Sequence, residues 1–512
     1  MRIRHLHFAF FLALTELVNP CAALAHAQGA DPLAIAYTRL YEGQPEEAQE
    51  RFDHLRRTDD DALGPWFGSL FVMMARMDYD DSLGPIFEQS VDSLIETASR
   101  RYGRTTQDSE ALFYLAQAYL LRSTYRLNFD KGMWGAARDA AKSKGYAEAY
   151  IRRHPEHGDA YLALGLYNYY VDIAPTVVKV VRVLLLLPSG NRAEGVKQLE
   201  RASTEGHLFA PFAETALADI HGSFEGRPDR ALPTLERLVQ RFPGNAEMRL
   251  ELASMYLHPA IEDYTRAEQH YQAVRAAASS DIPRHLSQRH SAILGLASVR
   301  RNQWRIDEAI SLLDDPIDSR PATPEWVMPN LLLRRANYKM LVNNPSAMDD
   351  ARRVLADSTF DTWHKAARRQ IRAIESHRRS SQAAVYAALL PSNRLVAEER
   401  FEEARAAYDA FARQHPDDWQ VRYRLAYLDF ARERYDAAAA GMQAIVAARS
   451  PMPGWLKAAA LLNLAWVHDI HGNRAQAVRL YRQILDDYED ESPAGAARLG
   501  LIAPFKVPIQ GG

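Results

Sequence analysis

The sequence predicts an all-α fold in which antiparallel helix pairs repeat along the chain and stack into a solenoid, a superhelix of helix pairs. Three observations predict it. Apolar residues recur at spacings of three and four, as on one face of a helix, and no sustained alternation of the strand type appears. Alanine and glycine return at corresponding positions in successive segments. The chain has 512 residues, which is long for one compact core and suits a repeat array.

The C-terminal quarter shows the repeat best. Ala404 and Ala438, each expected on the second helix of a pair, are 34 residues apart, and Ala477 follows after 39 because the turn at 450–454 is longer. The small residue lets two helices cross closely, and a large residue four positions later fills the gap between neighbouring pairs. These large residues are Tyr408, Met442 and Tyr481.

Looser copies of this pattern precede it and give roughly ten helix pairs. The pattern resembles the tetratricopeptide repeat (TPR) superfamily, over most of the chain. The resemblance implies a binding scaffold, because repeats of this kind specify a fold and little chemistry. A non-repetitive helical globule is the alternative. The earlier copies are marked by Ala36, Gly43, Ala48 and Phe52; Leu115, Ala116 and Tyr119; Tyr161, Leu164 and Gly165; Gly226, Ala231, Leu235 and Pro243; Leu252, Ala253, Ala267 and Tyr271; and Leu296, Ala297, Ala309 and Leu313.

An apolar insertion interrupts the repeat at 171–190. The first helix of this unit begins near Asp159, but its partner helix starts late, at Gly195. A helix over 176–187 would be about 18 Å long, which is too short to cross a bilayer. Burial inside the solenoid, a partner-binding or dimer surface, and a membrane-interface anchor remain alternatives.

The region 159–202 is also similar to a piece of the eukaryotic tetratricopeptide repeat 39 family. The similarity rests on the apolar insertion, on the turn Gly190-Asn191-Arg192 and on the helix that begins Gly195-Val196. It implies a shared repeat variant and nothing about cellular setting.

The repeat pattern is weakest between residues 355 and 391, where arginines are frequent. We therefore expect an N-terminal repeat block at 28–375, which includes the insertion, and a C-terminal TPR block at 376–512.

The N-terminus reads as a cleaved signal peptide at 1–27. Arg2 and Arg4 precede an apolar run at 8–14, and Ala25-His26-Ala27 forms a small-residue cleavage site. The single cysteine, Cys21, lies inside this segment, so the mature chain would hold no thiol. A lipid anchor on Cys21 is the alternative. Abundant alanine and the excess of arginine over lysine indicate a bacterial source, so we expect export to the periplasm of a Gram-negative bacterium or to the cell surface.

Charge and motifs limit the function classes. There are 62 basic and 65 acidic side chains, for a net charge of −3, which does not favour nucleic acid as a partner. No integral membrane span is expected; peripheral membrane contact through 176–187 is an alternative.

Motifs for zinc hydrolysis, a nucleophile elbow, a phosphate loop and a dinucleotide turn are all missing from the sequence. Two histidine groups have metal-like spacing, His154 with His157 and Asp159, and His468 with His471. We interpret both groups as structural. The chain is therefore expected to be a non-enzyme without cofactor or metal, and an enzyme or carbohydrate-handling accessory with an unrecognised site is the alternative.

The TPR resemblance places a concave groove along the first helix of each pair, for a protein or peptide partner. Aromatic side chains at such positions supply large contact area at low entropic cost. The alternative for each is burial in the solenoid core. The predicted groove residues are Tyr169, Tyr170, Tyr423, Tyr427, Phe430, Leu462, Trp466 and Asp469.

Overall fold

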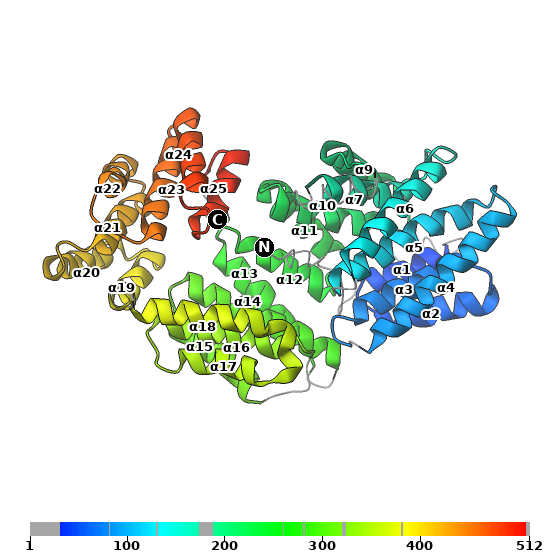
Figure 1. Cartoon of the computed structure of the whole chain (residues 1–512), viewed down its shortest axis with the longest axis horizontal. Coiled ribbons are helices and arrows are strands. Elements are labelled where there is room, and N and C mark those ends of the chain that lie inside the picture. Colours follow the sequence, from blue (N-terminus) through cyan, green and yellow to red (C-terminus); the bar gives the residue numbers. More distant parts are fainter. Residues whose placement is uncertain are drawn as a thin grey trace, which may run out of the picture. The chain divides into compact units, whose positions relative to one another are not determined.

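The structure is a computed structural model, and it describes residues 31–80, 82–129, 132–173, 188–259, 261–279, 282–319, 324–379 and 382–507. Within these ranges the chain forms 24 α-helices, one π-helix and one 3-10 helix, with no strand (Figure 1). The predicted all-α helical-repeat fold is confirmed. The signal peptide at 1–27, with Cys21, and residues 174–187 of the insertion lie outside the described residues.

The chain divides into two compact units. Unit 1 holds residues up to 224 together with 229–252 and 279–288, and unit 2 holds 225–228, 253–278 and 289 onward. Helices α12 and α14 contribute residues to both units. The predicted block boundary at 375/376 falls within α18, inside unit 2, and stays a prediction about the repeat pattern.

Unit 1 is a run of helix pairs in which each helix packs on the next. Many helices begin at recognisable signals: Asp108 caps α5 and Asn191 caps α9 through side-chain oxygens, and proline stands at the first turn of α1 and α2. The helices are α1 (Pro32–Tyr41), α2 (Pro45–Thr58), α3 (Leu63–Arg76), α4 (Leu83–Arg104), α5 (Ser109–Asn128), α6 (Met133–Ile151), α7 (Ala160–Ile173), α9 (Arg192–Glu205), α10 (Ala210–Asp219), the π-helix η1 (Ile220–Phe224), α11 (Pro228–Arg241) and α12 (Ala246–Tyr256).

Small residues set the close approach of α7 and α9, the helix pair that flanks the insertion. A Cβ atom added at Gly195 would lie 2.6 Å from the backbone nitrogen of Tyr169 and 2.8 Å from the carbonyl oxygen of Gly165. Because both neighbours are backbone atoms, only glycine permits this helix spacing. The predicted partner helix is present, but it begins at Arg192 rather than at Gly195, because the Asn191 side chain caps it three residues earlier than the small-residue pattern indicated.

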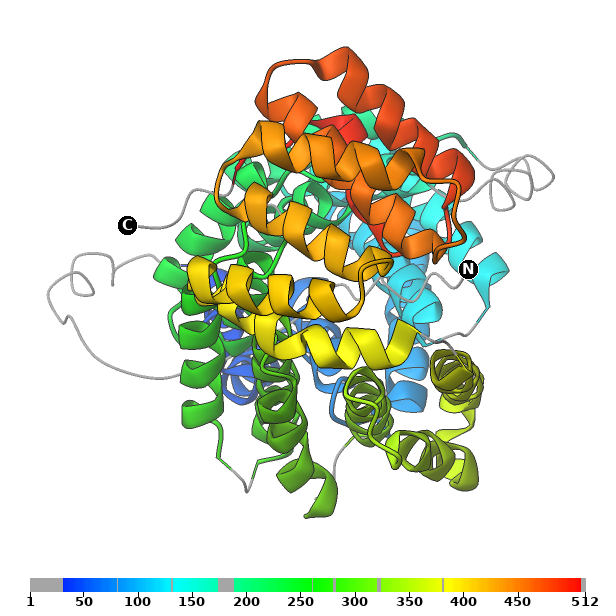
Figure 2. The same ribbon diagram turned by 90° about the vertical axis from the view of Figure 1, so that its left-hand side faces the viewer.

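Unit 2 continues the pattern, and Figure 2 shows α20 to α24, coloured from yellow to orange-red, lying side by side in successive layers. Gly441 on α22 approaches Ala426 on α21 so closely that a Cβ there would lie 2.7 Å from the alanine methyl. The helices are α13 (Tyr264–Ala277), α14 (Pro283–Asn302), α15 (Ile306–Asp318), α16 (Val327–Leu341), α17 (Ala347–Ala356), the 3-10 helix η2 (Ser358–Trp363), α18 (His364–Arg379), α19 (Gln382–Ala397), α20 (Phe401–Gln414), α21 (Trp419–Ala431), α22 (Tyr435–Ala447), α23 (Gly454–Ile470), α24 (Arg474–Asp487) and α25 (Pro493–Ile502).

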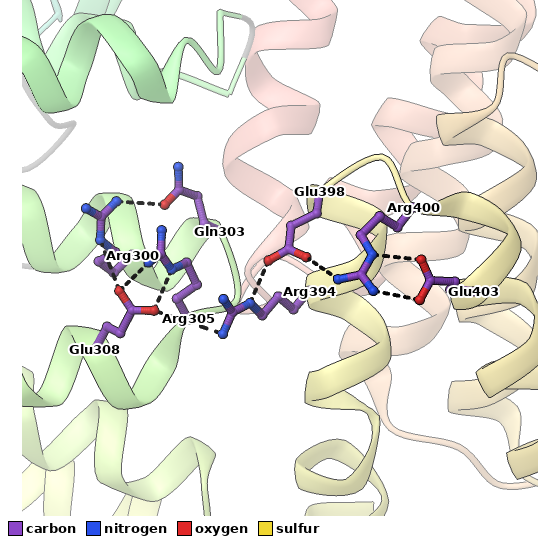
Figure 3. A network of polar contacts seen from close by, with 8 residues as sticks. All are labelled: Arg300, Gln303, Arg305, Glu308, Arg394, Glu398, Arg400 and Glu403. Atoms are coloured by element: carbon purple, nitrogen blue, oxygen red, sulfur yellow. Dashed lines mark hydrogen bonds and ion pairs between the residues drawn. The ribbon is translucent and has the colours of Figure 1, made fainter.

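Helix α19 joins the two parts of unit 2 at the place where the repeat pattern is weakest. Leu390 packs in the apolar cluster of α14 to α18, and Leu389 packs in the cluster of α20 and α21. An exposed polar network crosses the same point (Figure 3). Its bridging ion pair joins Arg394 to Glu308 at 4.0 Å, with both side chains more than two-fifths exposed. Since exposed pairs contribute little, the apolar packing of α19 in both clusters supplies most of the connection.

Candidate functional site

The groove residues predicted in unit 2 come from the first helices of two successive pairs, α21 and α23. Three rings follow one another along this surface: Tyr427 and Phe430 stack with centroids 6.2 Å apart, and Phe430 lies 6.0 Å from Trp466. All three side chains are partly exposed. The helical spacing brings Tyr427 and Phe430 onto one face of α21, and helix packing brings Trp466 beside them. We call Tyr427, Phe430 and Trp466 the aromatic row.

Two other predicted groove residues pack into the core behind the aromatic row. Tyr423 and Leu462 are both buried in the cluster formed by α21 to α25. The Tyr423 hydroxyl accepts a hydrogen bond from Asn463 Nδ2 at 3.2 Å, and burial raises its pKa. These two side chains support the surface, and a direct groove role for them stays a prediction.

Asp469 is a buried anchor at the end of α23. Its carboxylate is fully shielded and accepts hydrogen bonds from Arg474 Nη1 at 3.1 Å, from the Tyr481 hydroxyl at 2.8 Å and from the backbone N–H of Phe505 at 2.8 Å. Burial, followed by the adjacent carboxylate, raises the pKa of Tyr481. Asp469, a predicted groove residue, thus holds the turn between α23 and α24 and the segment after α25 in place.

Phe505 is the residue of this surface that sequence reasoning missed. Its ring stacks on Trp466 with centroids 4.4 Å apart and planes 17° apart, and its centroid lies 6.3 Å from that of Phe430. The repeat pattern ends before residue 503, so no offset could assign Phe505 a place. An aromatic residue between Pro504 and Lys506 was the one local signal.

The groove residues predicted in unit 1 have a different setting. Tyr169 is fully buried against α9, whereas Tyr170 is partly exposed and its hydroxyl donates to Asp219 Oδ2 at 3.4 Å. The Tyr170 ring also lies 5.6 Å from Phe224. Burial raises the pKa values of both Tyr170 and Asp219. Tyr170 is therefore engaged with η1, and its predicted groove role is untested.

Several carboxyl groups of unit 1 form an electrostatic feature that the sequence did not reveal. Burial is the largest cause of a raised pKa at Glu214, Asp219, Glu247 and Glu251, and Asp219 adds to the shift at Glu251. These residues are spread over α10 to α12, so only the fold places them near apolar surroundings. Ionisation of such groups opposes folding.

The first histidine group has structural contacts. His154 Nε2 lies 2.8 Å from Ser109 Oγ, and His157 Nδ1 lies 2.7 Å from the Tyr150 hydroxyl. Asp159 is completely buried and accepts N–H bonds from three consecutive residues before α10, at 2.9 to 3.1 Å. Asp159 therefore fixes the start of α10, 48 to 50 residues further along the chain.

The second histidine group lies at the end of α23. Burial, followed by neighbouring His471, lowers the pKa of His468. Within the described ranges, no group of three or more His, Cys, Asp or Glu side chains has a metal-binding arrangement. Likewise, no helix in the described part of the chain is long and apolar enough to cross a membrane.

Comparison with known proteins identifies the repeat. One tetratricopeptide repeat family model matches residues 224–282 and 392–453, and a second matches residues 459–490. Neither match includes 159–202, so the similarity of that region to the repeat 39 family stays a prediction. No curated protein matches the sequence.

Two solved structures match over most of the chain with little sequence identity. A human IFIT1 dimer with PPP-AAAA is 13% identical, covering 90% of this chain and 91% of that chain, with a TM-score of 0.35. Yeast Tom70 is 12% identical, covering 91% of this chain and 92% of that chain, with a TM-score of 0.33. The stacked helix pairs, their close small-residue contacts and the matching repeats lead to one conclusion: this chain is a tetratricopeptide repeat protein.

Proposed function

We propose that this protein is a scaffold that binds an extended peptide or a helix of a protein partner along the aromatic row of α21 and α23. One observation carries the proposal: Tyr427, Phe430 and Trp466 come from two successive repeats and form one continuous, partly exposed surface. Successive repeats with a continuous inner surface are how helical-repeat proteins bind extended ligands.

The chemistry of the aromatic row favours an apolar or aromatic ligand segment. Aromatic rings bury a large area while ordering only two side-chain torsions, so they concentrate binding energy. Burial raises the pKa of Tyr427, with an added contribution from Glu262. A phenol is neutral at physiological pH even at its ordinary pKa, so Tyr427 adds no negative charge to the aromatic row.

We propose that the protein binds a partner rather than catalysing a reaction, and that it does so at the cell envelope. Support for export comes from the basic start, apolar run and small-residue site at 1–27. A periplasmic or cell-surface scaffold of this kind would hold one component during envelope assembly. Amino-terminal sequencing of the protein recovered from periplasmic and surface fractions tests this placement: a mature start at Gln28 supports it, and an intact Met1 in the cytoplasmic fraction opposes it.

Partner capture tests the binding role. Tagged wild-type protein should recover a stoichiometric partner from envelope extracts, and Tyr427→Ala with Trp466→Ala should abolish recovery. A single hot-spot ring contributes about 2 kcal/mol or more, which corresponds to roughly a 30-fold loss in affinity. Wild-type recovery of contaminants alone would refute the proposal.

A matched tryptophan in unit 1 provides the control. Trp134 on α6 is 50% exposed and lies outside the aromatic row. Trp134→Ala should leave recovery unchanged. Loss of the partner with Trp134→Ala, and not with the Tyr427 and Trp466 changes, would place binding elsewhere and overturn the assignment. Circular dichroism of each variant confirms that the helical fold persists.

A further inference from the structure

The segment that follows α25, Ala503–Val507, is non-helical and places the Phe505 ring on the aromatic row. Phe505 makes both of its anchoring contacts there. The ring stacks on Trp466 at 4.4 Å, and the backbone N–H donates to Asp469 Oδ2 at 2.8 Å. The ring also approaches Phe430 from the neighbouring repeat, at 6.3 Å. One residue thus contacts side chains from α21 and α23.

The start of this segment is held by an arginine that also binds the Asp469 carboxylate. Arg474 Nη1 donates to the Asp469 carboxylate, and Arg474 Nη2 donates to the backbone carbonyls of Gly500 at 2.6 Å and Leu501 at 3.2 Å. The last turn of α25 is therefore fixed, and the chain leaves it in the direction of Trp466. This arrangement delivers Phe505 to the aromatic row at a high effective concentration.

Few contacts hold residues Ala503–Val507 themselves in place. Phe505 is only partly buried, and Lys506 and Val507 on its C-terminal side are exposed. The Phe505 ring, the hydrogen bond from its N–H to Asp469 and the hydrogen bond from the Ala503 N–H to the Leu499 carbonyl at 3.1 Å must offset the entropy of ordering the residues between α25 and Val507. A contact of this size suits an occupant that a competing ligand can displace.

We infer that Ala503–Val507 is an intramolecular ligand of the aromatic row, and that a partner peptide binds by displacing it. The inference rests on the proposed function and specifies its ligand and its regulation. The partner segment is extended, places an aromatic side chain on Trp466 and donates a backbone N–H to Asp469, as Phe505 does. Phe505 therefore lowers the affinity of the wild-type protein for its partner.

A labelled synthetic peptide with the sequence of residues 500–507 tests the inference by fluorescence anisotropy. A tethered segment has an effective concentration of roughly 1 mM, so a peptide with an intrinsic Kd near 0.1 mM should bind Phe505→Ala about tenfold more tightly than wild type. Trp134→Ala, which removes an exposed ring of unit 1 outside the aromatic row, should bind as wild type does. A peptide with alanine in place of phenylalanine should not bind Phe505→Ala.

A second measurement follows the segment itself. When the wild-type protein is saturated with peptide, hydrogen exchange in residues 503–507 of the protein itself should become faster. The reason is that the Phe505 N–H no longer donates its hydrogen bond to Asp469. Equal peptide affinity in Phe505→Ala and wild type, or unchanged exchange in wild type at saturation, would overturn the inference. Partner capture that still depends on Trp466 would then leave the proposed scaffold function standing. Failed capture with tenfold tighter peptide binding would instead overturn the scaffold function and leave only the intramolecular contact of Phe505 with the aromatic row.

Discussion

Gly195 offers the sharpest test of how the repeats are held together. In Gly195→Ala the new methyl group would lie 2.6 Å from the Tyr169 backbone nitrogen and 2.8 Å from the Gly165 carbonyl oxygen. Backbone atoms have no rotamer to change, so α7 and α9 must move apart. Overpacking of this kind costs up to about 3 kcal/mol. Alanine recovers about 1 kcal/mol of helix propensity, and the net loss should be about 2 kcal/mol.

Gly145, inside α6, is the matched control, because nothing lies within 4 Å of a Cβ added there. Gly145→Ala should stabilise the protein by about 0.5–1 kcal/mol. Urea unfolding followed by circular dichroism should separate the two variants. Hydrogen exchange should localise the loss in Gly195→Ala to α7 and α9, with amides there exchanging roughly 30-fold faster. A Gly195→Ala protein as stable as wild type, with both helices still protected, would refute the close-contact argument.

Three further predictions concern buried charge. Asp159→Ala removes the buried acceptor of three backbone N–H groups before α10 and should cost about 3 kcal/mol in urea unfolding; an unchanged midpoint would contradict this role. Arg335→Ala leaves the Asp350 carboxylate buried with only Lys339 and the more distant Arg353 beside it and should cost about 3 kcal/mol, seen as faster hydrogen exchange in α16 and α17. Burial raises the pKa of the Glu251 carboxyl group in the folded chain above its value in the unfolded chain. The stability that comes from this carboxyl group is therefore fully present below the unfolded pKa and is lost as the pH rises through the folded pKa. Glu251→Gln should therefore raise the urea midpoint at pH 7.5 and leave it nearly unchanged at pH 4; equal effects at both would exclude ionisation as the cause.

Much of the fold could be read from local spacing. Ala426 on α21 lies against Gly441 on α22. Gly165 and Gly195 similarly meet across the interrupted unit. These positions are predictable because a helix crossing needs small residues whatever surrounds the pair.

Only part of the candidate site could be predicted from the sequence. An offset within a repeat assigns a side chain to one face of its helix, which placed Tyr427, Phe430 and Trp466 together. The same offsets selected Tyr423 and Leu462, which the packing of α21 to α25 buries. Burial depends on which other helices cover that face, and no local pattern records it.

The sequence by itself determined that this chain forms stacked helix pairs, because helical spacing and recurrent small residues act between neighbours. Only the tertiary structure decided which of the predicted groove side chains are exposed and which residue, Phe505, packs on them. Asp469 meets Phe505 across 36 residues, and Asp159 meets Leu208 across 49. Such contacts follow from where the completed helices bring distant segments, and that is a property of the whole stack rather than of any repeat.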